Sequence, residues 1–131
     1  MVTHMYKQRL VRVKGFTLIE LLVVMSIIAT LLTIAVPYYF SNLVRSKEIV
    51  LKQDLLVMRK AIDDFLGDHG RHPQDLSELV ERKYIKEIPI DPLTKLSTTW
   101  ETDTSEAGDG IQNVRSGAKG LGRDETAYAQ W

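Results

Sequence analysis

Residues 14–44 read KGFTLIELLVVMSIIATLLTIAVPYYFSNLV, and Glu20 is the only charged residue between Phe16 and Val44. As an α-helix, residues 21–40 would be about 30 Å long, which is the thickness of the hydrocarbon core of a bilayer. A small soluble domain cannot easily bury a helix that is apolar on all sides. This run therefore predicts a membrane-spanning helix.

The segment before the apolar run is basic. Lys7, Arg9, Arg12 and Lys14 lie in residues 1–15, which contain no acidic residue. Positive charge before a span favours a cytoplasmic N-terminus, so we expect the rest of the chain across the membrane. Three interpretations compete: a cleavable secretory signal, a plain single-span anchor and a leader of a more specialised kind. The sequence around Pro37 is a poor site for secretory signal cleavage, which requires small residues.

The composition excludes several classes of protein. The chain has 131 residues, enough for one domain, with 17 basic and 17 acidic residues and no cysteine. Without cysteine there is no disulfide framework, zinc–thiolate site, iron–sulfur cluster or thiol nucleophile. A balanced charge also argues against nucleic-acid binding, which needs a concentrated basic face.

The stretch Gly15-Phe16-Thr17-Leu18-Ile19-Glu20, between a basic leader and the apolar run, resembles the class III signal of type IV prepilins and type II secretion pseudopilins. The resemblance implies that a membrane-embedded prepilin peptidase cuts between Gly15 and Phe16 and methylates the new N-terminus at Phe16. It also implies that the apolar helix is retained after the cut, unlike an ordinary signal.

Glu20 is costly inside a membrane, by about 2.5–3.5 kcal/mol on insertion scales, so it needs a partner or access to the interface. The resemblance implies that Glu20 pairs with the positive N-terminus of an adjacent subunit during assembly. The alternative partner is the amino group of its own Phe16, one helical turn away. The helix N-terminus itself favours negative charge by about 0.3–1 kcal/mol.

Pro37 lies within the apolar run and cannot donate a hydrogen bond to the Thr33 carbonyl. One interpretation is a simple kink, tolerated because the Thr30 or Thr33 hydroxyl re-satisfies the backbone. The other is a weak point at which the helix unwinds when it packs in a filament. The sequence alone leaves both open.

A helical pattern continues beyond the apolar run. Apolar residues recur at spacings of three and four along one face: Leu51, Leu55, Met58, Ile62 and Phe65. Charged residues stand between them, so this face is expected to form the core. We therefore predict one helix over residues 16–66, ended by Gly67 and Gly70.

The remaining chain predicts small elements around that helix. Residues 75–80 predict a short helix with Asp75 as N-cap and Glu78 three residues later. The prolines in 84–92 predict an extended turn. Strands are expected at 98–102, around Trp100, and at 111–115, with loops at 103–110 and 116–126. Tyr128 and Trp131 are expected to fix the C-terminus to the fold.

Residues 68–73 (DHGRHP) and 84–92 (YIKEIPIDP) are similar to the corresponding segments of major pseudopilins of type II secretion systems. The residues around Asn113–Ala118 and the Tyr128…Trp131 tail also resemble a pseudopilin. His72 stands where the family usually has tyrosine, and Lys95 where a turn glycine is common. The resemblance covers the whole chain.

The resemblance also implies a calcium ion in the C-terminal loop, bound through acidic side chains and main-chain oxygens. Calcium usually takes six to eight oxygen ligands. Lys119 stands near a position where an aspartate is expected, which leaves Asp124 and Glu125 as the candidate metal ligands. We therefore expect the loop to be held by hydrogen bonds and Trp131 without calcium.

No catalytic motif accompanies these features. His69 beside Asp68 suggests a catalytic pair, but no nucleophile motif accompanies it, and exposed turn residues are the simpler interpretation. We predict that the protein is not an enzyme, has no cofactor apart from the calcium in question, and binds no nucleic acid. Any ATP used in assembly would be hydrolysed by another protein.

Together these observations predict an α+β, type IV pilin-like fold: a long N-terminal helix packed against a short helix and a small antiparallel sheet. The expected parts are a leader at 1–15, an apolar membrane and assembly half-helix at 16–44, and a periplasmic globular domain at 45–131. The resemblance implies an inner-membrane subunit of a type II secretion pseudopilus. Its implied partners are copies of itself, prepilin peptidase, an assembly platform with its ATPase, and minor pseudopilins. The alternatives are a type IV pilin for adhesion, motility or DNA uptake, and a single-span anchored domain.

Overall fold

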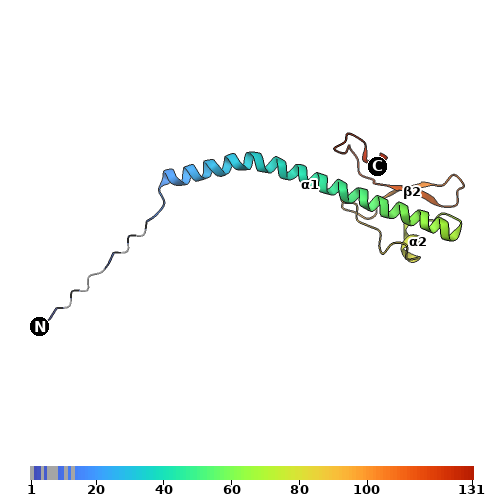
Figure 1. Cartoon of the computed structure of the whole chain (residues 1–131), viewed down its shortest axis with the longest axis horizontal. Helices are drawn as coiled ribbons and strands as arrows, with labels where there is room; N and C mark the ends of the chain where they lie inside the picture. The colour runs from blue at the N-terminus through green and yellow to red at the C-terminus, as the bar shows by residue number, and fades with distance from the viewer. Residues whose placement is uncertain (1, 4, 6–8, 11, 13) are drawn as a thin grey trace. The chain divides into compact units, whose positions relative to one another are not determined.

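The computed structural model describes residues 2–3, 5, 9–10, 12 and 14–131 (Figure 1). The remaining residues of the predicted leader lie outside the described residues. The chain forms two compact units, Met1–Tyr39 and Phe40–Trp131. The elements follow in the order α1, α2, β1, β2 and a final 3₁₀ helix, η1. The α+β class predicted from the sequence is confirmed.

Helix α1 runs without interruption over Leu18–His69 and includes the predicted amphipathic half. It ends three residues later than predicted, and Gly67 lies inside it. The actual stop is Gly70, which adopts a φ of +67° and donates its N–H to the Leu66 carbonyl at 2.9 Å. The ring of His69 stacks on Phe65 at 4.2 Å. This contact spans the last turn and helps to offset the cost of a mid-helix glycine, about 1 kcal/mol.

Pro37 does not interrupt α1. The Thr33 hydroxyl donates to the Ala29 carbonyl and the Thr30 hydroxyl to the Ser26 carbonyl, each at 2.9 Å. Both hydroxyls thus bond one turn earlier in their own helix, as threonine commonly does in this setting. Neither of these two bonds goes to the Thr33 carbonyl, and the choice between a simple kink and a weak point at Pro37 stays open.

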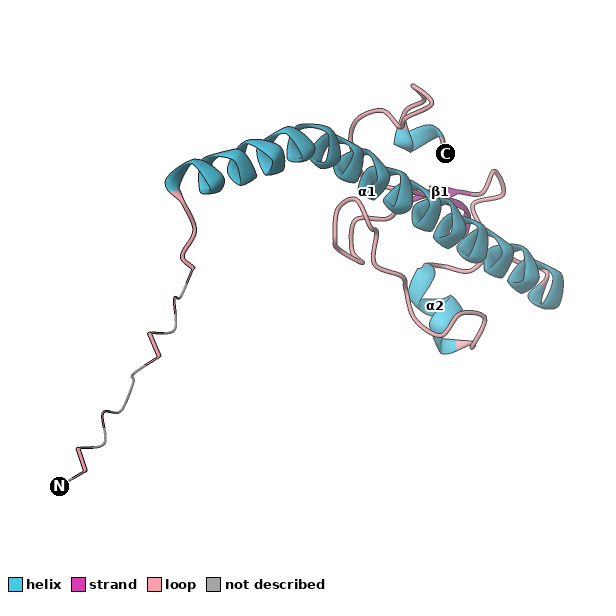
Figure 2. Ribbon diagram, turned by 60° about the vertical axis from the view of Figure 1, so that its left-hand side comes forward, coloured by secondary structure: helices cyan, strands magenta, loops and turns pink. Residues whose placement is uncertain are grey.

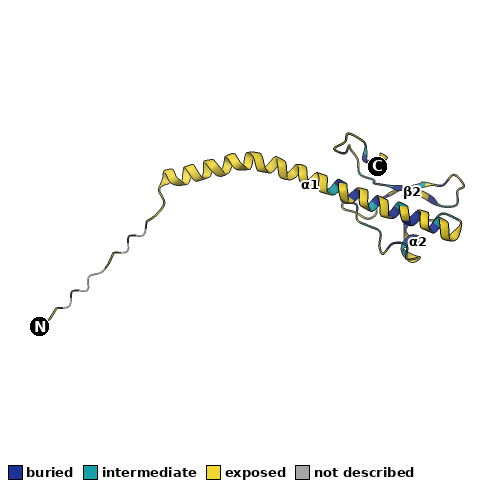
Figure 3. Cartoon of the chain, in the orientation of Figure 1, coloured by how far each residue is buried: buried dark blue, intermediate teal, exposed yellow. Residues whose placement is uncertain are grey.

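The first part of α1 is exposed throughout, whereas its last part is buried along one face (Figure 3). Every residue from 14 to 46 is exposed. Among the described residues, α1 is the one helix long and apolar enough to cross a bilayer. The apolar half is therefore exposed along its whole length in the part of the chain that the structure describes.

Helix α2 covers Leu76–Glu81 and begins as predicted. The Asp75 side chain accepts the Glu78 N–H at 2.9 Å and so caps the helix. The Glu78 carboxylate does not return this bond to Asp75. It accepts the Gln74 N–H at 2.6 Å and pairs with Arg71, also at 2.6 Å, which ties the start of α2 to the segment after α1.

Two short strands form an antiparallel sheet: β1 at Glu101–Thr104 and β2 at Ile111–Arg115. β2 is confirmed, but the strand predicted at 98–102 begins later, and Trp100 lies directly before it. The Trp100 indole N–H donates to the Pro89 carbonyl at 2.7 Å, so this side chain fixes the extended 84–92 turn instead of pairing within the sheet.

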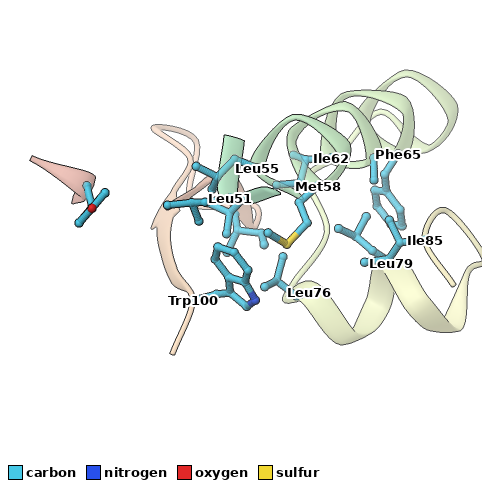
Figure 4. Packing of buried hydrophobic residues seen from close by; sticks show 13 residues of the cluster. Leu51, Leu55, Met58, Ile62, Phe65, Leu76, Leu79, Ile85 and Trp100 are labelled. Atoms are coloured by element: carbon cyan, nitrogen blue, oxygen red, sulfur yellow. The ribbon is translucent and has the colours of Figure 1, made fainter. Parts of the chain in front are cut away.

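The core lies between the second half of α1 and the elements around it (Figures 2 and 4). In both Figures 1 and 2, α2 and the C-terminal segment lie on opposite sides of this half of α1. The predicted apolar face of α1 is buried, and its residues are at most 1% exposed. Its partners come from α2, β2, η1 and the segment between α2 and β1: Leu76, Leu79, Ile85, Trp100, Ile111, Val114 and Tyr128.

Candidate functional site: the N-terminal motif and the C-terminal loop

The predicted cleavage position lies in a non-helical segment directly before α1. Gly15 and Phe16 are both exposed, and the Phe16 side chain is 89% accessible. An exposed bond outside a helix is accessible to a peptidase. Cleavage between Gly15 and Phe16 and methylation of Phe16 stay predictions.

Glu20 and Thr17 form a reciprocal capping arrangement at the start of α1. The Glu20 N–H donates to Thr17 Oγ1 at 3.2 Å, and the Thr17 N–H points to Glu20 Oε2 at 3.5 Å. This is the S/T-x-x-E capping box, which satisfies two of the free N–H groups at a helix start. This capping box was not predicted, although Thr17-Leu18-Ile19-Glu20 before an apolar run is its sequence signature. The carboxylate therefore stands at the first turn, where an intersubunit partner would have to approach.

In the C-terminal loop, the Asp124 carboxylate already accepts hydrogen bonds from Thr126. Its Oδ1 accepts the Thr126 hydroxyl at 2.6 Å and the Thr126 N–H at 3.1 Å. These bonds are the main reason that the pKa of Asp124 lies below its ordinary value. Glu125 is exposed and adopts a φ of +64°.

Among the described residues, no third acidic side chain joins the two candidate calcium ligands in a group that could hold a metal ion. Within the part of the chain that the structure describes, no group of three or more His, Asp or Glu side chains is placed to hold a metal ion. Calcium needs a larger set of oxygens than Asp124 and Glu125 provide. Asp124 and Glu125 by themselves therefore do not make up the calcium site that the resemblance implies.

Asp68 and His69 belong to the last turn of α1 rather than to a turn after it. The Tyr84 hydroxyl donates to Asp68 Oδ2 at 2.5 Å, and this bond raises the pKa of Tyr84 to about 12. His69 stacks on Phe65. Both side chains thus help to close the end of the core, where their hydrogen bonds go to the Tyr84 hydroxyl and the Phe65 carbonyl.

His72, which replaces the family's usual tyrosine, joins two segments that are 37 residues apart in sequence. Its ring Nδ1 lies 2.9 Å from Asp109 Oδ1, and the backbone N–H of His72 donates to Asp109 Oδ2 at 3.3 Å. The Ser105 hydroxyl also donates to Asp109, and these bonds, led by the one from Ser105, lower the pKa of Asp109 to about 2. This pairing was not predicted, because no local sequence pattern indicates a contact at that separation.

Lys95, the other departure, adopts a φ of +61°. This is the left-handed conformation that a glycine would take without strain and that costs a lysine about 1–2 kcal/mol. The Lys95 N–H donates to the Asp91 carbonyl at 2.7 Å, so the turn keeps its geometry despite the substitution.

The N-terminal segment matches a protein family. The family model for the prokaryotic N-terminal methylation motif covers residues 11–36. The matched segment includes Gly15, Phe16 and Glu20 and most of the exposed apolar half of α1.

Relatives of the chain include type II secretion system core protein G of Klebsiella pneumoniae, 31% identical over 97 residues, or 62% of this chain and 69% of the relative. The protein of the same name from Pseudomonas aeruginosa is 32% identical over 60% of this chain and 66% of its own length. The type IV major pilin protein PilE of Neisseria gonorrhoeae is 32% identical over 60% of this chain. No solved structure matched the chain.

The long helix with its small α+β domain and the methylation motif define a type IV pilin-like protein. The chain belongs to the family of type II secretion system core protein G, the major pseudopilins. It spans 51% of the length of the gonococcal pilin and about two thirds of the core protein G relatives, at 66% and 69%.

Proposed function

We propose that the protein is the structural subunit of a type II secretion pseudopilus, which polymerises to drive export of folded proteins. The observation that carries this proposal is the exposed apolar half of α1 that follows the methylation motif. Large side chains such as Leu31 and Ile34 are 61% and 71% exposed in a single copy of the chain. Burying apolar surface contributes roughly 25 cal/mol per Å². A bilayer covers this surface before assembly, and neighbouring copies cover it in the filament.

Processing precedes assembly in this proposal. Prepilin peptidase removes residues 1–15 and methylates Phe16. The cut creates a positive amino group at Phe16, one helical turn from Glu20. In a filament, the Glu20 carboxylate of one subunit pairs with the N-terminus of the next, because an unpaired charge among apolar helices is costly.

The subunit is anchored in the bacterial inner membrane by a single span, with its N-terminus in the cytoplasm and residues 45–131 in the periplasm. Lys14 and the other basic residues of the leader support this orientation. Its partners are other copies, the inner-membrane assembly platform with its ATPase, and minor pseudopilins. It acts as a structural subunit and not as an enzyme.

A type IV pilin is the second candidate, and the gonococcal pilin among the relatives favours it. The match to PilE covers 51% of that relative, and the pilin PilE1 of the same organism is covered to 67% at only 27% identity. The Klebsiella core protein G is 31% identical over 69% of its length, so the secretion subunit is the better-supported proposal. The two proposals predict different defects when the protein is missing: loss of protein export for a secretion subunit, and loss of surface pili for a pilin.

Deleting the gene in its own host tests the choice between them. We expect folded exoproteins to disappear from the medium and to accumulate in the periplasm, while surface pili and twitching motility persist. The wild-type gene on a plasmid should restore export. Normal export with loss of surface pili would contradict the secretion proposal and support the pilin.

A further inference from the structure

A buried carboxylate on α1 holds the C-terminal loop, residues 117–131. Glu48 is 8% exposed, and its Oε1 accepts the Arg123 N–H and the Tyr128 hydroxyl, both at 3.0 Å. The two donors lie on either side of Asp124 and Glu125. One oxygen atom of α1 therefore fixes the part of the loop in which the calcium ligands were predicted.

One turn further along α1, Lys52 brings a positive charge to the same loop. Its ammonium nitrogen lies 4.3 Å from the centroid of the Trp131 ring, which is a cation–π contact. The charge of Lys52 also acts on Asp124, where it adds to the lowering of the pKa that the Thr126 hydrogen bonds cause. A carboxylate and an aromatic face of the loop thus share one cation supplied by the helix.

Arg59 completes the attachment. It donates to the Trp131 carbonyl and, at 3.0 Å, to the Val114 carbonyl of β2, and so connects the loop to the sheet. Glu48, Lys52 and Arg59 are spaced four and seven residues apart, which places them along one side of a helix. The loop is therefore attached to α1 over about three turns.

We propose that Lys52 is the built-in cation of the C-terminal loop and, with Glu48, holds that loop in place of the calcium ion that the resemblance implies. A divalent ion at Asp124 would have to approach an ammonium group that is already there, and like charges repel. Oδ1 of Asp124 and Oε1 of Glu48 already accept two hydrogen bonds each. The loop keeps its conformation without a metal.

Hydrogen–deuterium exchange on the full chain in detergent micelles tests this proposal. Peptides from 117–131 are followed in calcium chloride and in a calcium chelator, for the wild type, Lys52→Met, Lys52→Arg and Glu48→Ala. Lys52→Met keeps most of the apolar stem and removes only the charge, whereas Lys52→Arg keeps the charge. Gln53→Ala, at a neighbouring exposed position, is the matched control.

We expect identical exchange of the wild-type loop with calcium and with chelator. Lys52→Met should exchange about two- to five-fold faster in the loop, the ratio that a cation–π contact supports. Glu48→Ala should exchange at least about ten-fold faster, because it removes hydrogen bonds to a charged group. Lys52→Arg and Gln53→Ala should match the wild type, and peptides from α2 should stay protected in all variants.

Two results would overturn the proposal. Protection of the wild-type loop by calcium would mean that a metal holds it. A Lys52→Met loop that exchanges at the wild-type rate would mean that Lys52 does not act as its cation. Since both readouts concern a single subunit, they do not depend on whether the filament belongs to a secretion system.

Discussion

Among single residues, Glu20 combines two tasks that can be separated. Its carboxylate caps the first turn of α1 through Thr17, and in the proposed filament it pairs with a neighbour's N-terminus. We predict that Glu20→Ala and Glu20→Gln insert into the membrane normally, because removing a charge lowers the cost of insertion. Both should give few or no filaments when sheared filaments are quantified by electron microscopy.

Thr17→Ala is the control for the capping task. It removes one cap, at a cost of about 0.5–2 kcal/mol, and leaves the carboxylate in place. We expect Thr17→Ala to assemble. Normal filament yield from Glu20→Ala would refute the intersubunit role and leave only capping.

The carboxylate of Asp109 makes stability depend on pH. Hydrogen bonds from Ser105 and His72 lower the pKa of Asp109 in the folded chain to about 2, from an ordinary 3.8. A depressed folded pKa means that the stabilisation is present above the unfolded pKa and is lost as pH falls toward the folded value. The melting temperature should therefore drop between about pH 4 and pH 2, and Asp109→Asn should reduce that drop.

Asp63→Asn, at an exposed position on α1, is the matched control and should melt with the wild-type pH profile. Glu78, whose pKa is also lowered to about 2 by Arg71 and the Gln74 N–H, contributes to the remaining drop. An unchanged profile in Asp109→Asn would show that the His72 pairing carries no pH dependence.

The stability of the globular domain depends on individual buried side chains of α1. Met58 is fully buried and Ile62 is 1% exposed. Truncating either to alanine should cost about 2–5 kcal/mol, because apolar contacts are lost and a cavity remains. Leu56 lies on the same helix but is 64% exposed, and it provides the control. In urea unfolding, Leu56→Ala should lower the free energy of unfolding by far less than Met58→Ala or Ile62→Ala.

At the level of elements, the hairpin depends on the close approach of its turn to the segment between α1 and α2. The Ile111 N–H donates to the Pro73 carbonyl at 2.8 Å. Gly110 lies against that segment with a φ of +144°, and a Cβ there would stand 2.3 Å from the Pro73 oxygen. Gly110→Ala should therefore move the hairpin away and lower the melting temperature.

Gly108→Ala provides the control for backbone strain alone. Gly108 also has a positive φ, +70°, but nothing lies within 4 Å of its Cβ position. We expect Gly108→Ala to cost about 1–2 kcal/mol from the left-handed conformation, and Gly110→Ala to cost clearly more. Equal melting temperatures for the two variants would contradict the close packing at Pro73.

For the whole molecule, the leader decides whether the chain is an anchor or a filament subunit. N-terminal mass analysis of the membrane fraction should show a chain that begins at methylated Phe16. Gly15→Ile should leave the leader attached, because a bulky residue replaces the glycine of the cleavage motif. Recovery of intact chains from cells that contain the peptidase would contradict processing.

Most of the architecture could be predicted from the sequence because it rests on patterns within one segment. The apolar run, the face from Leu51 to Phe65 and the Asp75 cap each depend on residues at most a few turns apart. Boundaries were less well predicted. Gly67 stayed helical and β1 began after Trp100, because packing at Phe65 and the bond to Pro89 outweighed local preference.

The hydrogen bonds between distant segments at the candidate sites were visible only in the tertiary structure. Glu48 meets Arg123 and Tyr128 across 75 and 80 residues, and His72 meets Asp109 across 37. Nothing in a single sequence marks such pairs, since burial and chain topology bring them together. The sequence by itself determined the apolar helix, its processing motif and the α+β class, because helix period and hydrophobicity are local properties. The fold decided which charged side chains hold the C-terminal loop, because that choice depends on distances between segments far apart in the chain.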